Sequence, residues 1–139
     1  MGAQMVRMLL KVVICLVLGV ITPANAATAQ SQREMNDAAG RELRAVEAEM
    51  NAALDRLFKL AEGKPRSVAK LRDAQSAWLA FRDAHIKAYW PSEESGTYGS
   101  VHPMCVAHEL ARLTRARLVE LRAMTDRVEG DVCACQWPD

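Results

Sequence analysis

Histidine and cysteine side chains are the residues of this chain best suited to chemistry, and they gather between residues 102 and 135. His102, Cys105 and His108 recur every three residues, and Cys133 and Cys135 could add two thiolates. Imidazole and thiolate are ligands that zinc and copper favour, so these five residues are candidates for a metal site. A three-residue repeat drifts around a helix, however, which makes periplasmic metal binding the alternative hypothesis.

Catalysis has little support in the same segment. Cys105 and His108 could act as nucleophile and base, but such a pair one turn apart on a helix is most often incidental. His108 and Glu109 begin a pattern like that of a zinc-protease helix, but Arg112 stands where the second histidine is needed. The sequence also lacks a phosphate-binding glycine loop. We therefore expect no enzymatic activity, no catalytic residues and no cofactor.

A second group of candidates lies in a turn-rich segment. Residues 91–102 are rich in serine and glycine, a composition that favours turns over helix. Trp90, Tyr98, Ser100 and His102 place aromatic and hydrogen-bonding groups beside these glycines, which makes them candidates for binding a partner. A solvated connector between two helices is the alternative interpretation of the same residues.

Three helices are expected to position these residues. A capping box predicts that the first helix starts at residues 31–34, and it ends before Gly63. The second helix is predicted over residues 67–90 and the third over residues 103–130. The sequence shows no sustained alternation of apolar and polar residues, which is the pattern that indicates strands. The expected fold is therefore all-α, a small antiparallel three-helix bundle with a long loop between the second and third helices.

The second predicted helix carries two sets of side chains. Its apolar stripe, predicted to pack against the other helices, consists of Leu71, Ala74, Trp78, Phe81 and His85. A polar set lies at the edge of Trp78 and consists of Gln75, Arg82, Asp83, Thr114 and Arg117. We interpret Trp78 with this polar set as a structural motif that specifies the fold. Direct contact of the motif with a partner is the alternative.

Three short sequences together resemble the LprI-type lysozyme-inhibitor family. They are EMN at residues 34–36, LRDAQSAWLAFRDA at residues 71–84 and LTRAR at residues 113–117, and the resemblance spans about residues 32–122. It implies a small exported helical protein that binds and blocks lysozyme without catalysis. Positions where relatives usually carry cysteine are occupied here by Ala38, Ile86 and Glu109. A structural or adaptor domain of the cell envelope is a further alternative.

The first residues of the chain predict export. Residues 1–26 combine basic residues, an apolar run over residues 12–21 and small residues before a cleavage point, which together are typical of a signal peptide. The apolar run is about half of the ~20 residues that a membrane-spanning helix needs, so we expect no stable membrane insertion after its removal. Cleavage before Ala27 would leave one helical domain, residues 27–139, in the periplasm or secreted.

The mature chain is nearly neutral and keeps three cysteines. Loss of Arg7 and Lys11 with the signal changes the formal net charge from +1 to about −1. Basic and acidic residues are interspersed, which argues against nucleic acid as a partner. Thiols in an export compartment tend to oxidise, so one disulfide is expected between Cys105 and either Cys133 or Cys135. The sequence leaves open which of the two it is.

Overall fold

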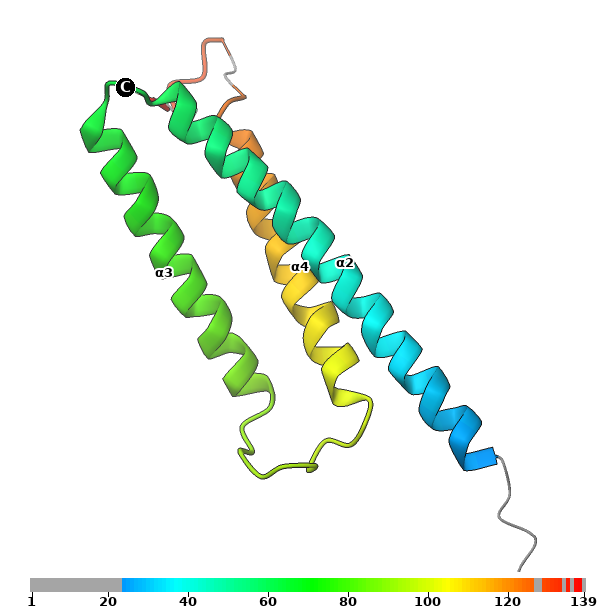
Figure 1. The fold of residues 1–139 in the computed structure, drawn as a ribbon. Coiled ribbons are helices and arrows are strands. Elements are labelled where there is room, and N and C mark those ends of the chain that lie inside the picture. Colours follow the sequence, from blue (N-terminus) through cyan, green and yellow to red (C-terminus); the bar gives the residue numbers. More distant parts are fainter. Residues whose placement is uncertain (1–23, 127–128, 134, 136, 139) are drawn as a thin grey trace, which may run out of the picture. The chain divides into compact units, whose positions relative to one another are not determined.

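The computed structural model describes residues 24–126, 129–133, 135 and 137–138, with side chains from Ser31 onward. It contains three helices, α2 (Ala24–Leu60), α3 (Pro65–Tyr89) and α4 (His102–Ala123), shown in Figure 1. Within these residues there is no strand, so the predicted all-α class and the number of helices are confirmed. Most of the predicted signal peptide, residues 1–23, lies outside the described part of the chain.

The ends of α2 and α3 agree with the predicted stop signals, whereas the predicted end of the third helix at residue 130 is wrong, because α4 ends at Ala123. The predicted start of the first helix also differs from the structure. α2 begins at Ala24, upstream of the predicted capping box at residues 31–34, which lies inside the helix. Alanine, the strongest helix former, is frequent in residues 24–30, and this propensity extends the helix toward the N-terminus. After Leu60, Gly63 adopts a φ of 81°, a conformation that favours glycine, and Pro65 begins α3.

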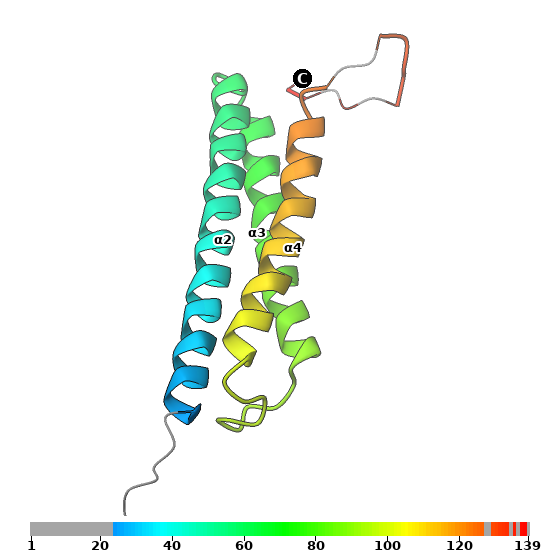
Figure 2. The same cartoon turned by 90° about the vertical axis from the view of Figure 1, so that its right-hand side faces the viewer.

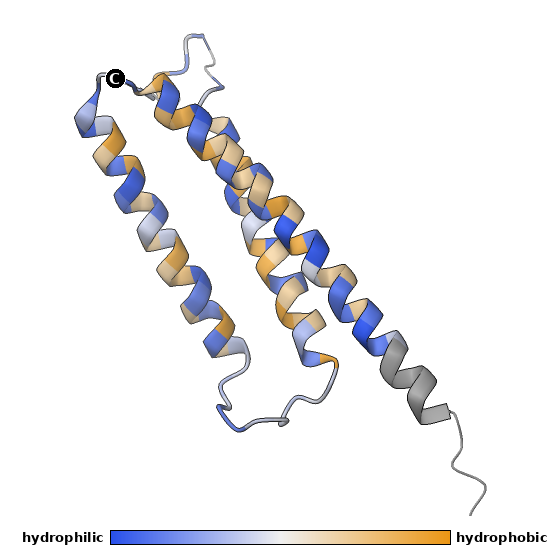
Figure 3. Ribbon diagram, viewed as in Figure 1, coloured by the Kyte–Doolittle hydropathy of each residue, from blue (hydrophilic) through white to orange (hydrophobic). Residues whose placement is uncertain are grey.

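All three helices contribute to the apolar core. One cluster of buried side chains joins α2, α3 and α4 and consists of Met50, Leu54, Leu57, Leu71 and Leu121. A second joins α2 to α4 and consists of Val46, Ala111 and Leu118. Each helix carries both apolar and polar residues along its coloured length in Figure 3, as amphipathic helices require. None of the helices among the described residues combines the length and the apolar character needed to cross a membrane.

The orientation of α3 about its axis differs from the predicted one. Leu71 is buried and Trp78 packs against the core, as predicted, but Ala74 and Phe81 of the same predicted stripe are exposed. The half-buried side chains of α3 include those of Gln75 and Arg82, which make hydrogen bonds to other helices. The polar residues therefore lie on the inner face of α3, and part of its apolar surface faces solvent.

Polar contacts between the helices show how their sequences run past one another (Figures 1 and 2). Glu42 of α2 contacts Arg115 of α4, and Glu49, further along α2, contacts Arg122, further along α4. The contacts of α3 have the opposite order, because later residues of α3 contact earlier residues of α2 and of α4. The contacts that show this are Arg82 with Glu47, Gln75 with Met50, His85 with Glu109 and Gln75 with Arg117.

The segment that follows α4 returns to the core. Trp137 packs against the cluster that contains Leu57 and Leu121. Lys64, in the turn between α2 and α3, donates a hydrogen bond from Nζ to the carbonyl of Pro138 at 3.0 Å. Residues 137–138 therefore cover the end of the core at which α2 passes into α3.

Leu121→Ala tests whether the three-helix core carries the stability of the protein. Leu121 is 1% exposed, and we expect its truncation to lower the free energy of unfolding by about 3 kcal/mol. Val119→Ala on the same helix is the matched control, because Val119 is 66% exposed and should change stability by less than about 0.5 kcal/mol. Urea unfolding followed by circular dichroism measures both. Equal effects of the two substitutions would contradict this core.

Candidate functional site

Three of the four predicted partner-binding residues lie together where α3 ends and α4 begins. The ring centroid of His102 is 5.3 Å from that of Trp90, in an edge-on arrangement, and 4.8 Å from that of Tyr98. Such aromatic contacts stabilise a pair by about 0.5–1.5 kcal/mol beyond the area that they bury. We call Trp90, Tyr98 and His102 the aromatic cluster. His102 is its central member.

Backbone turns give the connecting residues 90–101 a defined course. Gly96 and Gly99 have φ values of 84° and 70°, and the amide of Gly99 donates to the carbonyl of Gly96 at 3.0 Å. The amide of Ser92 donates to the hydroxyl of Tyr98 at 2.8 Å, which closes the segment on itself. The phenol oxygen is the acceptor in this bond, so its proton is available for another partner.

Asn36 ties this segment to α2. Its side-chain amide Nδ2 donates to the carbonyl of Ser100 at 3.1 Å, and Asn36 is the last residue of the EMN sequence. The fourth predicted residue, Ser100, thus uses its backbone for this contact and is itself exposed. The structure gives the EMN asparagine a physical role that the sequence alone did not indicate, because its acceptor lies 64 residues further along the chain.

The ring of His102 is held by packing. Its Nε2 atom is buried and has no hydrogen-bond partner among the described residues. Leaving a buried polar atom unpaired costs free energy, on the order of 1–3 kcal/mol, and such atoms are concentrated at functional positions. The remainder of the imidazole contacts Trp90 and Tyr98, which fix its orientation.

A charged group that the sequence analysis did not combine lies next to this cluster. Glu109 of α4 contacts His85 of α3 at 2.9 Å between Oε1 and Nε2, and Arg112 at 2.6 Å between Oε1 and Nη2. The hydrogen bond from Arg112 is the largest cause that lowers the pKa of Glu109, and His85 adds to it, so that the pKa falls to about 2. The spacing of Glu109 and Arg112 predicts their pairing, whereas His85 was assigned to an apolar stripe.

Aromatic rings continue from the cluster along α3. The centroids of Trp90 and Tyr89 are 5.4 Å apart, those of Tyr89 and His85 are 5.0 Å apart, and those of His85 and Phe81 are 5.7 Å apart. Tyr89 is 60% exposed and Phe81 is 54% exposed. The contact of His85 with Glu109 therefore lies in the middle of a row of rings, two of which face solvent.

The members of the predicted structural motif lie on α3 and α4, and Gln75 and Arg82 among them also contact α2. Arg82 lies over the ring of Trp78, with its central carbon 5.5 Å from the ring centroid, and donates to Glu47 of α2 at 3.2 Å. Arg82 also contacts Asp83, its neighbour in sequence, at 3.4 Å. Arg117 of α4 donates to the side-chain oxygen of Gln75 at 3.2 Å. These contacts join the motif residues of α3 to α2 and α4, and the structural role of the motif stays a prediction.

Thr114 has a different role from the predicted one. It is fully buried, and its hydroxyl donates to the carbonyl of Leu110 in its own helix at 2.7 Å. A buried threonine satisfies its hydroxyl in this way without a partner on another helix. Thr114 therefore supplies volume to the core and no hydrogen bond to the edge of Trp78.

The five alternative metal ligands do not come together. His102, Cys105 and His108 lie in the first two turns of α4, whereas Cys133 and Cys135 follow its opposite end. Eighteen helical residues separate Cys105 from Ala123, which is a rise of about 27 Å. Among the described residues, no group of three or more His, Cys, Asp or Glu side chains could hold a metal ion.

The structure does not contain the predicted disulfide, because its cysteines also lie at opposite ends of α4. Cys105, Cys133 and Cys135 are free thiols, the first half-buried and the other two exposed. A disulfide needs Cα atoms within about 7 Å, and the packing of Trp137 on the core holds the tail at the far end of α4 from Cys105. A bridge to Cys105 would require the tail to leave the core.

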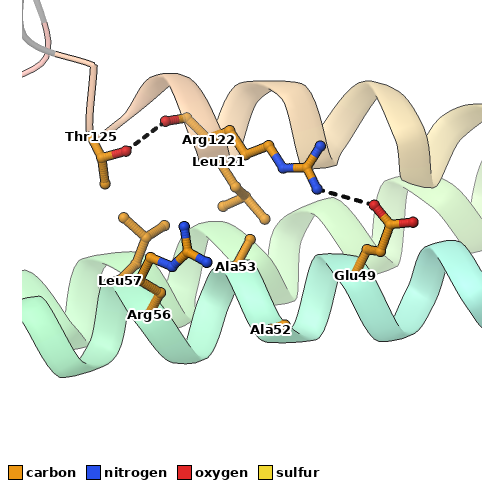
Figure 4. Close-up of a pocket in the computed structure, with 8 residues that line it drawn as sticks. All are labelled: Glu49, Ala52, Ala53, Arg56, Leu57, Leu121, Arg122 and Thr125. Carbon is orange, nitrogen blue, oxygen red and sulfur yellow. Dashed lines mark hydrogen bonds and ion pairs between the residues drawn. The ribbon is translucent and has the colours of Figure 1, made fainter.

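A hollow of about 140 Å³ lies between α2 and α4 at that far end (Figure 4). Leu57, Leu121 and Ala53 line it, and Arg122 spans its rim to donate to Glu49 at 3.0 Å. Leu121 is about 19 residues along α4 from His102, a rise of about 28 Å. The hollow is therefore a feature of the core and is separate from the aromatic cluster.

The fold and this site define a small all-helical protein with an aromatic cluster at the junction of two helices. The chain belongs to the LprI lysozyme inhibitor family, whose model matches residues 23–121, and the predicted resemblance is thereby confirmed. It is also similar to an uncharacterized protein of Rhizobium meliloti (strain 1021), with 29% identity over 133 residues that cover 83% of this chain and 94% of the relative. No solved structure matches this one.

Glu109→Gln tests the contacts that Glu109 makes with His85 of α3 and with Arg112 of α4. The folded protein holds the pKa of Glu109 at about 2, below its ordinary value of 4.5, so the unfolded chain binds the proton first as the pH falls. Stability from this group is therefore complete above about pH 5 and is lost between about pH 5 and pH 2. We expect wild type to lose roughly 1–2 kcal/mol more than Glu109→Gln between pH 5 and pH 3, allowing for solvent screening at Arg112.

Urea unfolding at both pH values measures this difference. Glu120→Gln is the matched control, because Glu120 also pairs with an arginine of α4 but its side chain is 63% exposed. We expect the control to follow wild type within about 0.5 kcal/mol. An acid-induced loss for Glu109→Gln as large as that of wild type would contradict the role of this pair.

Proposed function

We propose that this protein inhibits lysozyme by binding and performs no chemistry itself. The observation that carries the proposal is the aromatic cluster, held in a defined conformation at the junction of α3 and α4 in a chain of the LprI family. In this proposal residues 90–102 lie across the substrate cleft of the enzyme. Lysozyme is thus the partner, and the helices hold the segment in place.

The chemistry of the segment suits the cleft of a lysozyme. Lysozyme cleaves between two carboxyl groups, one protonated and one ionised, so an inhibitor needs groups that donate hydrogen bonds to them. The phenol oxygen of Tyr98 accepts the bond from Ser92, so that bond does not use the phenol O–H as a donor. Ser100 is exposed beside it. The rings of Trp90 and Tyr98 could stack where sugar rings bind, and Gly99 allows close approach of the backbone.

A rigid scaffold favours such binding, because little conformational entropy is then lost in the complex. We propose that α2, α3 and α4 form an antiparallel three-helix bundle, with residues 90–101 as the long loop between its last two helices. The order of the interhelical contacts along α3 supports this arrangement. The hydrogen bond from Asn36 to Ser100 supports a fixed position of the loop relative to α2.

Export completes the proposal. Residues 1–26 act as a signal peptide, cleavage occurs before Ala27, and residues 27–139 form the mature domain in the periplasm or outside the cell. The apolar run of the signal and the small residues Ala24 and Ala26 support this. Export also brings the protein to the compartment in which a lysozyme would attack the cell wall.

Inhibition should depend on Tyr98, which is half-buried, and on Ser100, which is exposed. We expect the mature protein to slow the clearing of a cell-wall suspension by lysozyme, and Tyr98→Ala combined with Ser100→Ala to weaken inhibition at least about 10-fold. The backbone contact of Ser100 with Asn36 is retained in this variant. The helical circular-dichroism signal and the melting temperature should stay close to those of wild type.

Two further variants separate binding from folding. Ser95→Ala changes an exposed serine of the same segment outside the cluster and should leave inhibition unchanged. Trp78→Ala should lose helical signal and inhibition together, because Trp78 packs against the core. Full inhibition by the double variant would exclude this mechanism. Absence of inhibition by wild type across several lysozyme classes would exclude the proposed function.

The proposed cleavage of the signal peptide predicts the mass of the mature protein. We expect intact-mass analysis of the periplasmic fraction to give the mass of residues 27–139, and the protein to stay in solution without detergent. A mass that retains residues 1–26, or that includes an added lipid, would contradict the assignment of the signal peptide. Ala26→Asp, which places a charge at the cleavage point, should cause the precursor to accumulate.

A further inference from the structure

The solvent-facing side of α3 carries a regular apolar stripe that no other part of the described chain covers. Its members are separated by three, four, three and four residues, and all of them are exposed: Ala74, Ala77, Phe81, Ala84 and Ala88. We call these five residues the outer stripe. This spacing is the heptad pattern by which two helices pack along each other in a coiled coil. The inner face of α3 meets α2 and α4, so the outer stripe is available to a partner.

Phe81 distinguishes the outer stripe from a run of small residues. Its ring is 54% exposed although it lies in the middle of a well-formed helix. The large ring of Phe81 projects from the helix, and the small alanines on either side of it leave space beside the ring. When a second copy of the helix runs in the opposite direction, its alanines leave space for the ring of the first copy.

We propose that two copies of this protein form a symmetric dimer through their outer stripes, with the two α3 helices antiparallel. Reversing the direction of one helix pairs Phe81 of each copy with Ala77 of the other, and Ala74 with Ala84. Each ring thereby fills the space above a small residue, as knobs-into-holes packing requires. The arrangement is isologous and closes at two copies.

Charge favours this direction over the parallel one. α3 has the basic residues Arg66 and Lys70 at its beginning and Lys87 in its last turn, with the acidic Asp73 between them. In the antiparallel register, Asp73 lies beside Lys87 of the second copy, and both side chains are exposed. In a parallel dimer the basic ends would face each other and repel.

The first experiment measures the mass of the mature protein in solution by sedimentation equilibrium. We expect twice the mass of one chain at concentrations of roughly 100 µM. Ala77→Glu places a charge against the ring of Phe81 from the second copy and should raise the dimer dissociation constant at least about 100-fold. Ala116→Glu, at an exposed alanine of α4, is the matched control and should leave the dimer intact. Circular dichroism confirms that both variants are helical.

The second experiment tests the direction of the helices. Asp73→Lys should weaken the dimer about 10-fold, because it faces Lys87 of the second copy in both symmetric halves. Asp73→Lys combined with Lys87→Asp should restore the dissociation constant to within about 2-fold of wild type. A monomeric wild-type protein, or a dimer insensitive to Ala77→Glu, would overturn the proposal. A dimer that is lost with Ala77→Glu but not restored by the charge exchange would overturn the antiparallel register.

Discussion

The orientation of α3 about its axis depends on hydrogen bonds made by two arginines. Arg82 donates to Glu47 of α2, and Arg117 of α4 donates to Gln75, and both arginine side chains are largely shielded from water. A shielded guanidinium that loses its partner is strongly destabilising, so rotation of α3 in either direction is resisted. The same orientation brings His85 to Glu109 and turns Phe81 toward solvent.

The helices themselves could be predicted from the sequence, whereas their orientation could not. Gly63, Pro65 and Pro91 act locally, so the ends of α2 and α3 follow from the residues present. α3 has apolar residues on two sides, and the hydrophobic pattern alone favoured the side that contains Phe81. The side that packs inward is chosen by Gln75 and Arg82, whose partners belong to helices distant in the chain.

The candidate site was predicted in its residue types and missed in its geometry. Trp90, Tyr98 and His102 were identified because aromatic residues stand out in a glycine-rich segment. Their contact depends on turns at Gly96 and Gly99, which composition does not specify. Glu109 was noted only as a departure from a cysteine pattern and as part of an incomplete zinc-protease pattern. In the structure, its contact with His85 links α3 to α4 at that position.

The packing of Trp137 on the core has a consequence for the time course of folding. The chain is synthesised from its N-terminus, so the residues of all three helices are made before Trp137, whose side chain covers the end of the core. Until then, the apolar surface around Leu57 and Leu121 lacks one of its neighbours. Synthesis of the three helices and the final packing of the core are therefore separate in time.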